Sequence, residues 1–329
     1  MWSQGSVTPH FIDIACRNLS RQSASSTRKE STLTGDKGRT IGKKAILIGF
    51  LVGLACVMDL LICRSAFAWG PGVHTVIALR SLDAAANLFS IIGQIIISNP
   101  LEYLYGSLAA DFFLMKTRLK STRHAHHWKG GFALLNEAKT DKEKAYAYGF
   151  LAHLAADVIA HNVFIPNLVN IFPNKRGGAH LYWEIRADYV VGPVYTRIAR
   201  NVLSTEQQAC DNILRSVING RRKGLSTRKK IYTQSVKISD YLYDTIPNLF
   251  DRNTLRWEGF KEYSLRMVMV SSLFVSEFLQ DPFNSVCLKH DPNGKVRLRR
   301  SKRRGVFTRF LRSRRPYLPA PKSGEIFRI

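Results

Sequence analysis

Apolar residues recur at helical spacing through most of this chain. Between residues 69 and 288, segments with an apolar position at every third or fourth residue are separated by proline and glycine. No stretch there alternates apolar and polar residues convincingly, as a half-buried strand would. The pattern therefore predicts an all-α domain of about 220 residues, and no internal repeat is visible within it.

Local signals bound several of these helices. Thr140 and Glu143 form a capping box that opens a helix reaching about Asn162. Residues 179–201 are predicted to form one helix that bends at Pro193. The other predicted features are a helix over 205–219, a basic loop and helix start over 220–232, a buried closing helix over 259–280, and breaks at Gly130-Gly131 and at Pro166.

Most of the positive net charge lies at the two ends of the chain, outside the predicted helical domain. The 329 residues contain 49 Lys and Arg against 24 Asp and Glu, a formal charge of +25. Residues 1–44 carry +5 and residues 289–329 carry +12, which leaves +8 for the apolar middle. With 45% hydrophobic residues, the composition excludes uniform disorder and a protein of many membrane spans. It also argues against a module that only binds nucleic acid.

A targeting segment precedes the helical region. Residues 45–63 are apolar except for Asp59, two lysines precede them, and Ala66-Phe67-Ala68 follows. A positive flank, an apolar stretch and an A-x-A site predict a signal peptide cleaved after Ala68. The alternative is an uncleaved membrane anchor formed by residues 45–63. The predicted parts are a disordered extension (1–42), a signal peptide (43–68), the helical domain (69–288) and a basic, disordered tail (289–329).

Few cysteines would remain after such cleavage. Only Cys210 and Cys287 follow residue 68, and a single disulfide between them stays an open alternative. The chain has no C-x-x-C pair, so thiolate zinc sites are not indicated.

The strongest chemical signal is a set of histidines and acids on two apolar helices. His153, Asp157 and His161 follow at i, i+4 and i+8, so they share one helix face. His180 and Glu184 form another i, i+4 pair. A core histidine or a surface ion pair explains any one of these residues. Burying all of them without a metal would leave several polar groups unsatisfied, so the set predicts a zinc site.

Together with the segment 69–74, WGPGVH, these motifs resemble the zinc-dependent phospholipase C family. That family shares its fold, an all-α, orthogonal multi-helix bundle around a zinc cluster, with the fungal single-strand-specific nucleases. The resemblance implies that the mature chain begins at Trp69, whose free α-amino nitrogen and carbonyl oxygen chelate a zinc ion. It implies that His74, five residues on, binds the same ion. An uncleaved chain would have no free amine at Trp69.

The resemblance also implies which residues of this chain are the remaining metal ligands. The family places an Asp about fifteen residues before a His, which corresponds to Asp111 and His126, with His127 a close competitor and His124 a weaker one. His153 and Asp157 follow as His-x3-Asp, and His161 comes four residues later where the family has about six. The resemblance implies three zinc ions. The first is bound by Asp111, His126, His153 and Asp157, and the second by His161, His180 and Glu184. The third is bound by Trp69, His74 and Asp157, which bridges it to the first.

The expected activity is phosphodiester hydrolysis. The expected location is outside the cytoplasm, with the mature protein either secreted or periplasmic. Clustered zinc ions suit the attack of a zinc-bound hydroxide on phosphorus, and Asp111 is expected to be both ligand and general base. The His-x3-Glu ending and the predicted secretion favour a phospholipase C that cleaves phospholipid headgroups at a membrane surface. The alternatives are a nuclease of the same fold acting on nucleic acid, and a non-catalytic member that keeps its metals. No protein partner is predicted.

Two features bear on that choice of substrate. Arg and Lys runs mixed with apolar residues over 295–315 are typical of a solvated tail, or alternatively of a segment that docks on a membrane surface. A nuclease needs aromatic platforms near the metals on which bases can stack. The available candidates, which are also candidates for buried core, are Phe112, Phe113, Trp128, Tyr182 and Trp183.

Overall fold

The computed structural model describes residues 69–86, 90–113, 127–171, 179–219, 224–245 and 259–294. The predicted extension and signal peptide, His126 and the residues after 294 lie outside this part of the chain. So do the side chains of residues 113, 170, 171, 179–181, 218, 219, 244 and 245. The α-helices are α3 (Pro71–Ala85), α4 (Ile91–Ser98), α5 (Pro100–Ala109), α6 (Trp128–Glu137), α7 (Asp141–Ile159), α8 (Ile165–Ile171), α9 (Ala179–Val191), α10 (Pro193–Ser204), α11 (Gln208–Leu214), α12 (Leu225–Thr245) and α13 (Phe260–Gln280).

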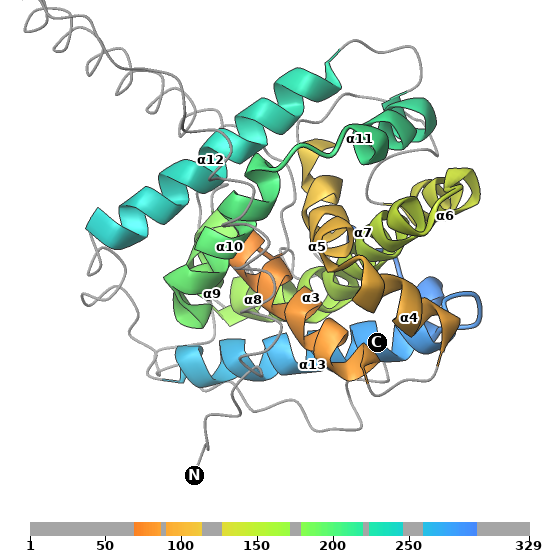
Figure 1. Cartoon of the computed structure of the whole chain (residues 1–329). Coiled ribbons are helices and arrows are strands. Elements are labelled where there is room, and N and C mark those ends of the chain that lie inside the picture. The colour runs from red at the N-terminus through yellow and green to blue at the C-terminus, as the bar shows by residue number, and fades with distance from the viewer. Residues whose placement is uncertain are drawn as a thin grey trace, which may run out of the picture. The chain divides into compact units, whose positions relative to one another are not determined.

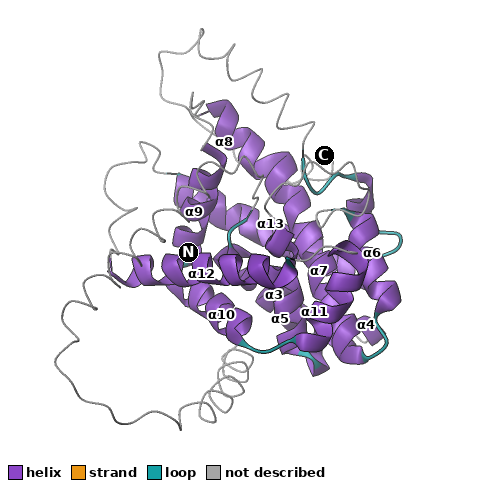
Figure 2. Cartoon of the chain, turned by 90° about the horizontal axis from the view of Figure 1, so that it is seen from above, coloured by secondary structure: helices purple, strands orange, loops and turns teal. Residues whose placement is uncertain are grey.

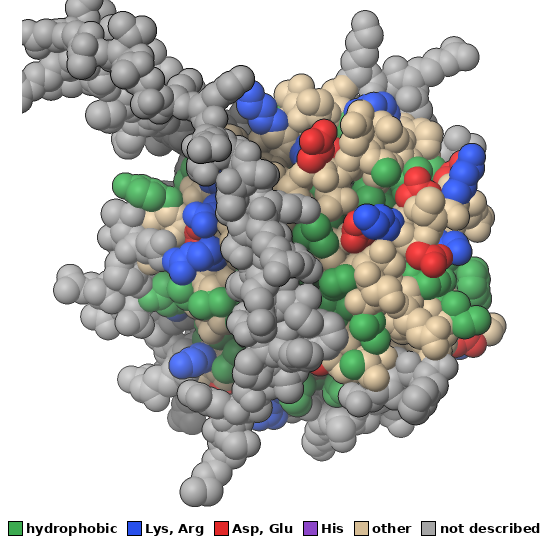
Figure 3. All heavy atoms as spheres, in the orientation of Figure 1, with side chains coloured by type: hydrophobic (Ala, Val, Ile, Leu, Met, Phe, Trp, Pro, Cys, Tyr) green, Lys and Arg blue, Asp and Glu red, His purple; other side chains and the backbone are tan. Residues whose placement is uncertain are grey.

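The described residues form helices and no strand, as Figure 2 shows, and this confirms the predicted all-α class. Short 3₁₀ turns, η1 (Ala110–Phe113) and η4 (Val286–Lys289), and π-helical turns, η2 (Ala160–Phe164) and η3 (Arg215–Asn219), extend several of the helices. On the face drawn in Figure 3, the described basic side chains are interspersed with acidic and apolar ones. Among the described side chains visible there, neither sign forms a large field.

Helix α7 is the central element of the fold. It contacts α3, α4, α5, α6 and α13 (Figure 1), and every residue from Ala145 to Ile159 is buried. The predicted capping box is present, because Thr140 Oγ1 accepts from the Glu143 N–H and the Glu143 carboxylate accepts from the Thr140 N–H. The stretch Asp141–Val169 is long and apolar enough to cross a membrane, but the burial of 89% of its most apolar window is that of a core helix.

Helices α5 and α7 approach each other through glycine. A Cβ atom on Gly106 would lie 2.0 Å from the carbonyl oxygen of Tyr146, and one on Gly149 would lie 2.0 Å from that of Tyr103. Neither position can carry a side chain without separating the two helices. This close approach fixes the position of α5 along the axis of α7. It thereby also fixes the position of the residues that follow α5.

Two predicted boundaries differ from the structure. Residues 179–201 do not form one bent helix, because Gly192 has φ of +102° and ends α9, and Pro193 then begins α10. Gly130 and Gly131 do not break a helix but lie inside α6, where a Cβ on Gly131 would meet the Leu151 side chain at 2.5 Å. At Gly192 the left-handed backbone decides the outcome, and at Gly131 the close packing of α6 on α7 decides it.

Pro166 does not end the helical chain either. A proline inside a helix removes one N–H donor and clashes with the carbonyl four residues earlier, here that of Asn162. The chain widens into the π-turn η2 over Ala160–Phe164 immediately before α8 begins. The turn therefore lets α7 continue into α8, and it carries His161.

The contacts of the domain continue to Gly294. Trp128 Nε1 donates to the carbonyl of His290 at 2.9 Å, and Asn162 Nδ2 donates to that of Asp291 at 3.0 Å. Gly294 has φ of +54°, and a Cβ there would lie 2.4 Å from the carbonyl oxygen of His161. The segment after α13 thus packs against the π-turn.

We expect Gly149→Ala to destabilise the fold by about 2 kcal/mol or more, because the new methyl group meets backbone, which cannot move aside as a side chain can. Thermal unfolding followed by circular dichroism measures the loss as a lower Tm. Gln94→Ala, at an exposed position of α4, is the control and should leave Tm nearly unchanged. Equal Tm values for the two variants would contradict the close approach of α5 and α7.

Candidate metal centre

Six of the predicted ligands lie in the buried interior. Each is at most 4% exposed, and together they come from five elements. Helix α7 provides two of them, one turn apart, and the others arrive on separate parts of the chain. They are His74 on α3, Asp111 on η1, His153 and Asp157 on α7, His161 on η2 and Glu184 on α9.

Three of these residues form a compact group of ligand atoms. The donor atoms of His74, Asp111 and His153 lie within 4.8 Å of one another. The two imidazole rings stack, with centroids 3.8 Å apart and an interplanar angle of 15°. Asp111 Oδ1 lies 3.5 Å from His153 Nε2. This spacing suits donors that surround one or two cations, since ligand bonds of about 2 Å place neighbouring donors roughly 3 to 4 Å apart.

Asp157 connects this group with the other predicted ligands. Its Oδ1 lies 3.4 Å from His74 Nε2, and its Oδ2 lies 3.3 Å from His153 Nε2 and 3.9 Å from His161 Nε2. The two oxygens therefore face different histidines. A carboxylate placed in this way has the geometry of a bridge between neighbouring cations, the role that the sequence comparison implied for Asp157.

His153 is held in the orientation of a ligand. Its Nδ1 donates to the carbonyl of Ser107 at 2.8 Å, which leaves Nε2 turned toward Asp111 and Asp157. Burial alone would lower the pKa of this imidazole, but the two carboxylates outweigh it and raise the pKa to about 9. Ser107 lies on α5, so the glycine contact between α5 and α7 sets this hydrogen bond.

Comparison with known families accounts for this arrangement. The family model described as zinc-dependent phospholipase C matches residues 73–237, half of the chain. The chain belongs to the zinc-dependent phospholipase C family. No curated protein and no solved structure matches the chain. The matched region includes all six of the buried ligands and the start of α12.

The residues of this family member fit a zinc site. Four carboxylates, those of Asp111, Asp157, Glu184 and Asp188, are buried in one region. Burial and then the charges of the other three raise the pKa of Glu184 well above its usual range, which reflects excess negative charge. His74 Nε2 is buried and makes no hydrogen bond among the described residues, although Asp157 lies 3.4 Å away. A bound cation supplies both the missing partner and the missing positive charge.

The other predicted ligands have different outcomes. Trp69 is fully buried, and its ring packs on Phe164 with centroids 4.4 Å apart. His126 lies outside the described residues, and so does the side chain of His180, so both stay predictions. His127 is half-buried and directly precedes α6. The choice between His126 and His127 therefore rests on the sequence spacing.

Asp188 is a site residue that sequence reasoning missed. Its carboxylate accepts from the N–H groups of Gly72 at 3.0 Å and Val73 at 2.8 Å, at the first turn of α3. A Cβ on Gly70 would lie 2.4 Å from this carboxyl carbon, so the chain passes directly over it. Asp188 thereby ties α9 to the start of α3, between Trp69 and His74. The available signal was its position one turn after Glu184, on the same helix face.

We expect zinc binding to release at least one proton at pH 7. The pKa of His153 is about 9 in the metal-free protein, so this imidazole is protonated at neutral pH and must lose its proton to become a ligand. The apparent affinity should therefore fall as the pH drops below about 9. Calorimetric zinc titrations in buffers of different ionisation enthalpy measure the proton count, and a count of zero would contradict the assignment of His153.

We expect Asp188→Asn to destabilise the protein by about 1–3 kcal/mol, because an amide has one acceptor oxygen for two backbone N–H groups. Urea unfolding measures the change in free energy. Asp141→Asn is the matched control, since its carboxylate is 65% exposed at the start of α7 and its loss should cost less than about 0.5 kcal/mol. The prediction fails if both variants unfold at the same urea concentration.

Proposed function

We propose that this protein is a secreted, zinc-dependent phosphodiesterase that cleaves phospholipid headgroups in the manner of a phospholipase C. The observation that carries the proposal is the buried group of His74, Asp111 and His153, in a chain of this family. Phosphodiester hydrolysis requires a site that activates water and offsets charge on phosphoryl oxygens. Buried imidazoles and carboxylates able to hold several cations provide for both requirements.

Three zinc ions are proposed. Bound zinc lowers the pKa of water toward ~7 and stabilises negative charge on the phosphoryl and leaving oxygens. Burial of the surrounding side chains strengthens these electrostatic effects, because little water is present to screen them. The proposed ligands are Trp69, His74, Asp111, His126, His153, Asp157, His161, His180 and Glu184.

Asp111 is the proposed general base. It lies at the edge of the cluster in the short turn η1, with Oδ1 3.5 Å from His153 Nε2 and its side chain 4% exposed. A carboxylate in this position accepts a proton from an attacking water and orients the water toward phosphorus. Asp157 lies deeper, between three histidines, and is better placed to hold cations than to exchange protons.

The proposed zinc site also requires secretion, because removal of the signal peptide frees one of its ligands. Cleavage after Ala68 would make Trp69 the first residue and free its α-amino group as a zinc ligand. The complete burial of the Trp69 side chain supports this, because it makes Trp69 a packed part of the domain. The competing arrangement, a protein anchored by residues 45–63, would leave the Trp69 nitrogen acylated.

A single-strand nuclease is the second candidate, and the burial of aromatic residues weighs against it. Base stacking needs accessible rings. Phe112 is 2% exposed and Trp183 is 4% exposed, and both rings pack against other aromatic residues of the core. Trp128 and Tyr182 are only partly buried. The core position of Phe112 and Trp183 favours a lipid substrate over single-stranded DNA.

The proposal is tested on the chain expressed with its N-terminal segment and purified after secretion. Intact mass shows whether the chain begins at Trp69, and elemental analysis counts the zinc. Hydrolysis is then compared between phosphatidylcholine and single-stranded DNA. Diacylglycerol release with two or more zinc ions supports the proposal. Cleavage of DNA alone would support the nuclease, and bound zinc without hydrolysis of either substrate would support a non-catalytic role.

We expect Asp111→Asn to reduce kcat on phosphatidylcholine by about 100-fold or more, because an amide cannot accept the proton. The fold should persist, since the substitution keeps the size of the side chain. Asp141→Asn changes the same charge at an exposed position and should keep wild-type turnover. Wild-type kcat for Asp111→Asn, measured by diacylglycerol release, would remove Asp111 from the mechanism.

A further inference from the structure

Tyr232 contacts a proposed zinc ligand from a helix outside the ligand set. It lies on α12, is 6% exposed, and its hydroxyl donates to Asp111 Oδ2 at 3.3 Å. The carboxylate can only accept in this hydrogen bond, so the phenol hydroxyl is the donor.

Because of this hydrogen bond, the two carboxylate oxygens of Asp111 have different partners. Oδ1 lies 3.5 Å from His153 Nε2, inside the cluster, while Oδ2 faces Tyr232 on the other side. A carboxylate held at one oxygen cannot rotate freely about its terminal bond. The phenol thus fixes which oxygen of Asp111 faces the metals, as partners of metal-bound carboxylates generally do.

The ring of Tyr232 is itself held in place by its neighbours. It packs edge-on against Phe112, with centroids 5.7 Å apart and an interplanar angle of 63°. Phe112 directly follows Asp111 in η1 and packs on Tyr105, with centroids 5.8 Å apart. The aromatic contact and the hydrogen bond therefore join η1 to α12 at two adjacent residues.

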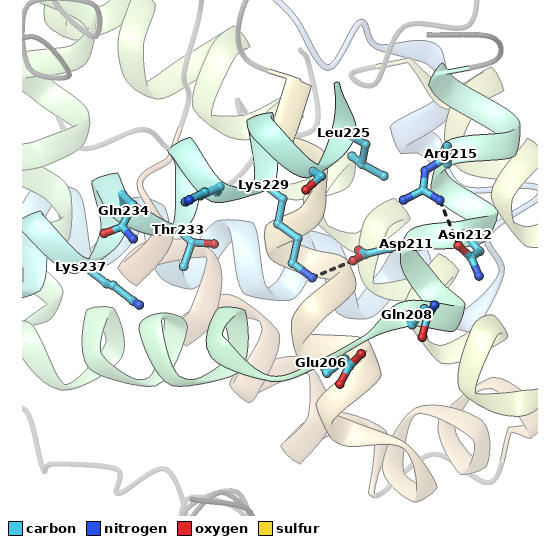
Figure 4. Close-up of a pocket in the computed structure, with 12 residues that line it drawn as sticks. Glu206, Gln208, Asp211, Asn212, Arg215, Leu225, Lys229, Thr233, Gln234 and Lys237 are labelled. Atoms are coloured by element: carbon cyan, nitrogen blue, oxygen red, sulfur yellow. Dashed lines mark hydrogen bonds and ion pairs between the residues drawn. The ribbon is translucent and has the colours of Figure 1, made fainter. Parts of the chain in front are cut away.

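The same face of α12 is anchored one turn earlier, near Tyr105. Lys229, one turn before Tyr232, lies 2.7 Å from Asp211 and 5.0 Å from the centre of the Tyr105 ring. The Tyr105 hydroxyl donates to Asp211. Figure 4 shows the Lys229–Asp211 ion pair in a groove of about 470 Å³ between α11 and α12. Two contacts one turn apart on this face, those of Lys229 and Tyr232, thus hold α12 in place.

We propose that Tyr232 is a positioning residue for the zinc cluster, which orients Asp111 as ligand and base without contacting substrate or metal. The Lys229–Asp211 pair supports it by holding α12 in register. This inference rests on the proposed phosphodiesterase function for its kinetic consequence. Its consequence for metal binding is independent of any substrate.

The test is Tyr232→Phe in the full mature protein, which removes only the hydroxyl. We expect zinc affinity, measured by competition with a chelator, to fall 10- to 100-fold, and kcat on phosphatidylcholine to fall with it while KM stays nearly unchanged. The visible absorption bands of the cobalt-substituted protein should also shift, because they report the ligand geometry.

Tyr103→Phe is the matched control. Tyr103 is buried as well, and its hydroxyl lies 2.6 Å from that of Ser81, which is not a proposed ligand. Both variants lose one buried hydrogen bond, so both should lower Tm by a similar amount. Only Tyr232→Phe should change metal affinity and the cobalt spectrum. Identical metal affinities and spectra for the two variants would overturn the inference.

A second variant keeps the test decisive if Tyr232→Phe does not fold. Lys229→Met breaks the ion pair at a partly exposed position and should weaken zinc affinity in the same direction but by less. Unchanged affinity in that variant would then reject the role of α12. If the wild-type protein hydrolyses no diester, the proposed function fails, while zinc affinity still decides the role of Tyr232.

Discussion

The structure depends on the placement of a buried carboxylate, Asp157, among three imidazoles. An isolated charge at 1% exposure would be strongly destabilising, but His153 and His74 surround its two oxygens. Burial alone would raise the pKa of this carboxyl, and the histidines instead hold it well below its usual range. Because these histidines come from different helices, the charge can be buried only when α3, α7 and the π-turn are assembled.

Several features of the fold serve this assembly. The glycine contact between α5 and α7 brings the Ser107 carbonyl to His153, and so directs the ring toward the cluster. Asp188 ties the first turn of α3 to α9, which places His74. The π-turn before Pro166 keeps His161 within 3.9 Å of Asp157, although the chain has two residues fewer there than the family pattern. The first two of these features act between elements far apart in sequence, whereas the π-turn acts within one continuous stretch of chain.

Part of the site was predictable because its signal is local. The i, i+4 spacing of His153 and Asp157 places both on one turn of α7, and the structure shows them 3.3 Å apart. The capping box at Thr140 also depends on four consecutive residues. Asp188 and Tyr232 escaped prediction, since an aspartate that binds backbone N–H groups and a tyrosine that binds a carboxylate have no spacing rule. Their partners lie 115 and 121 positions away.

The sequence alone determined the helical class, the start of α7, the family, and six histidines and acids that lie together in the interior, because each follows from residue type and local spacing. Only the tertiary structure decided that α9 and α10 are separate helices, that Gly131 lies inside one, and which atoms of Asp111 and Asp157 face which histidines. The break between α9 and α10 comes from the positive φ of Gly192 before Pro193, whereas the other outcomes depend on close contacts between distant helices. Such contacts are set by the shape and volume of the packed side chains, which hydrophobic periodicity does not record.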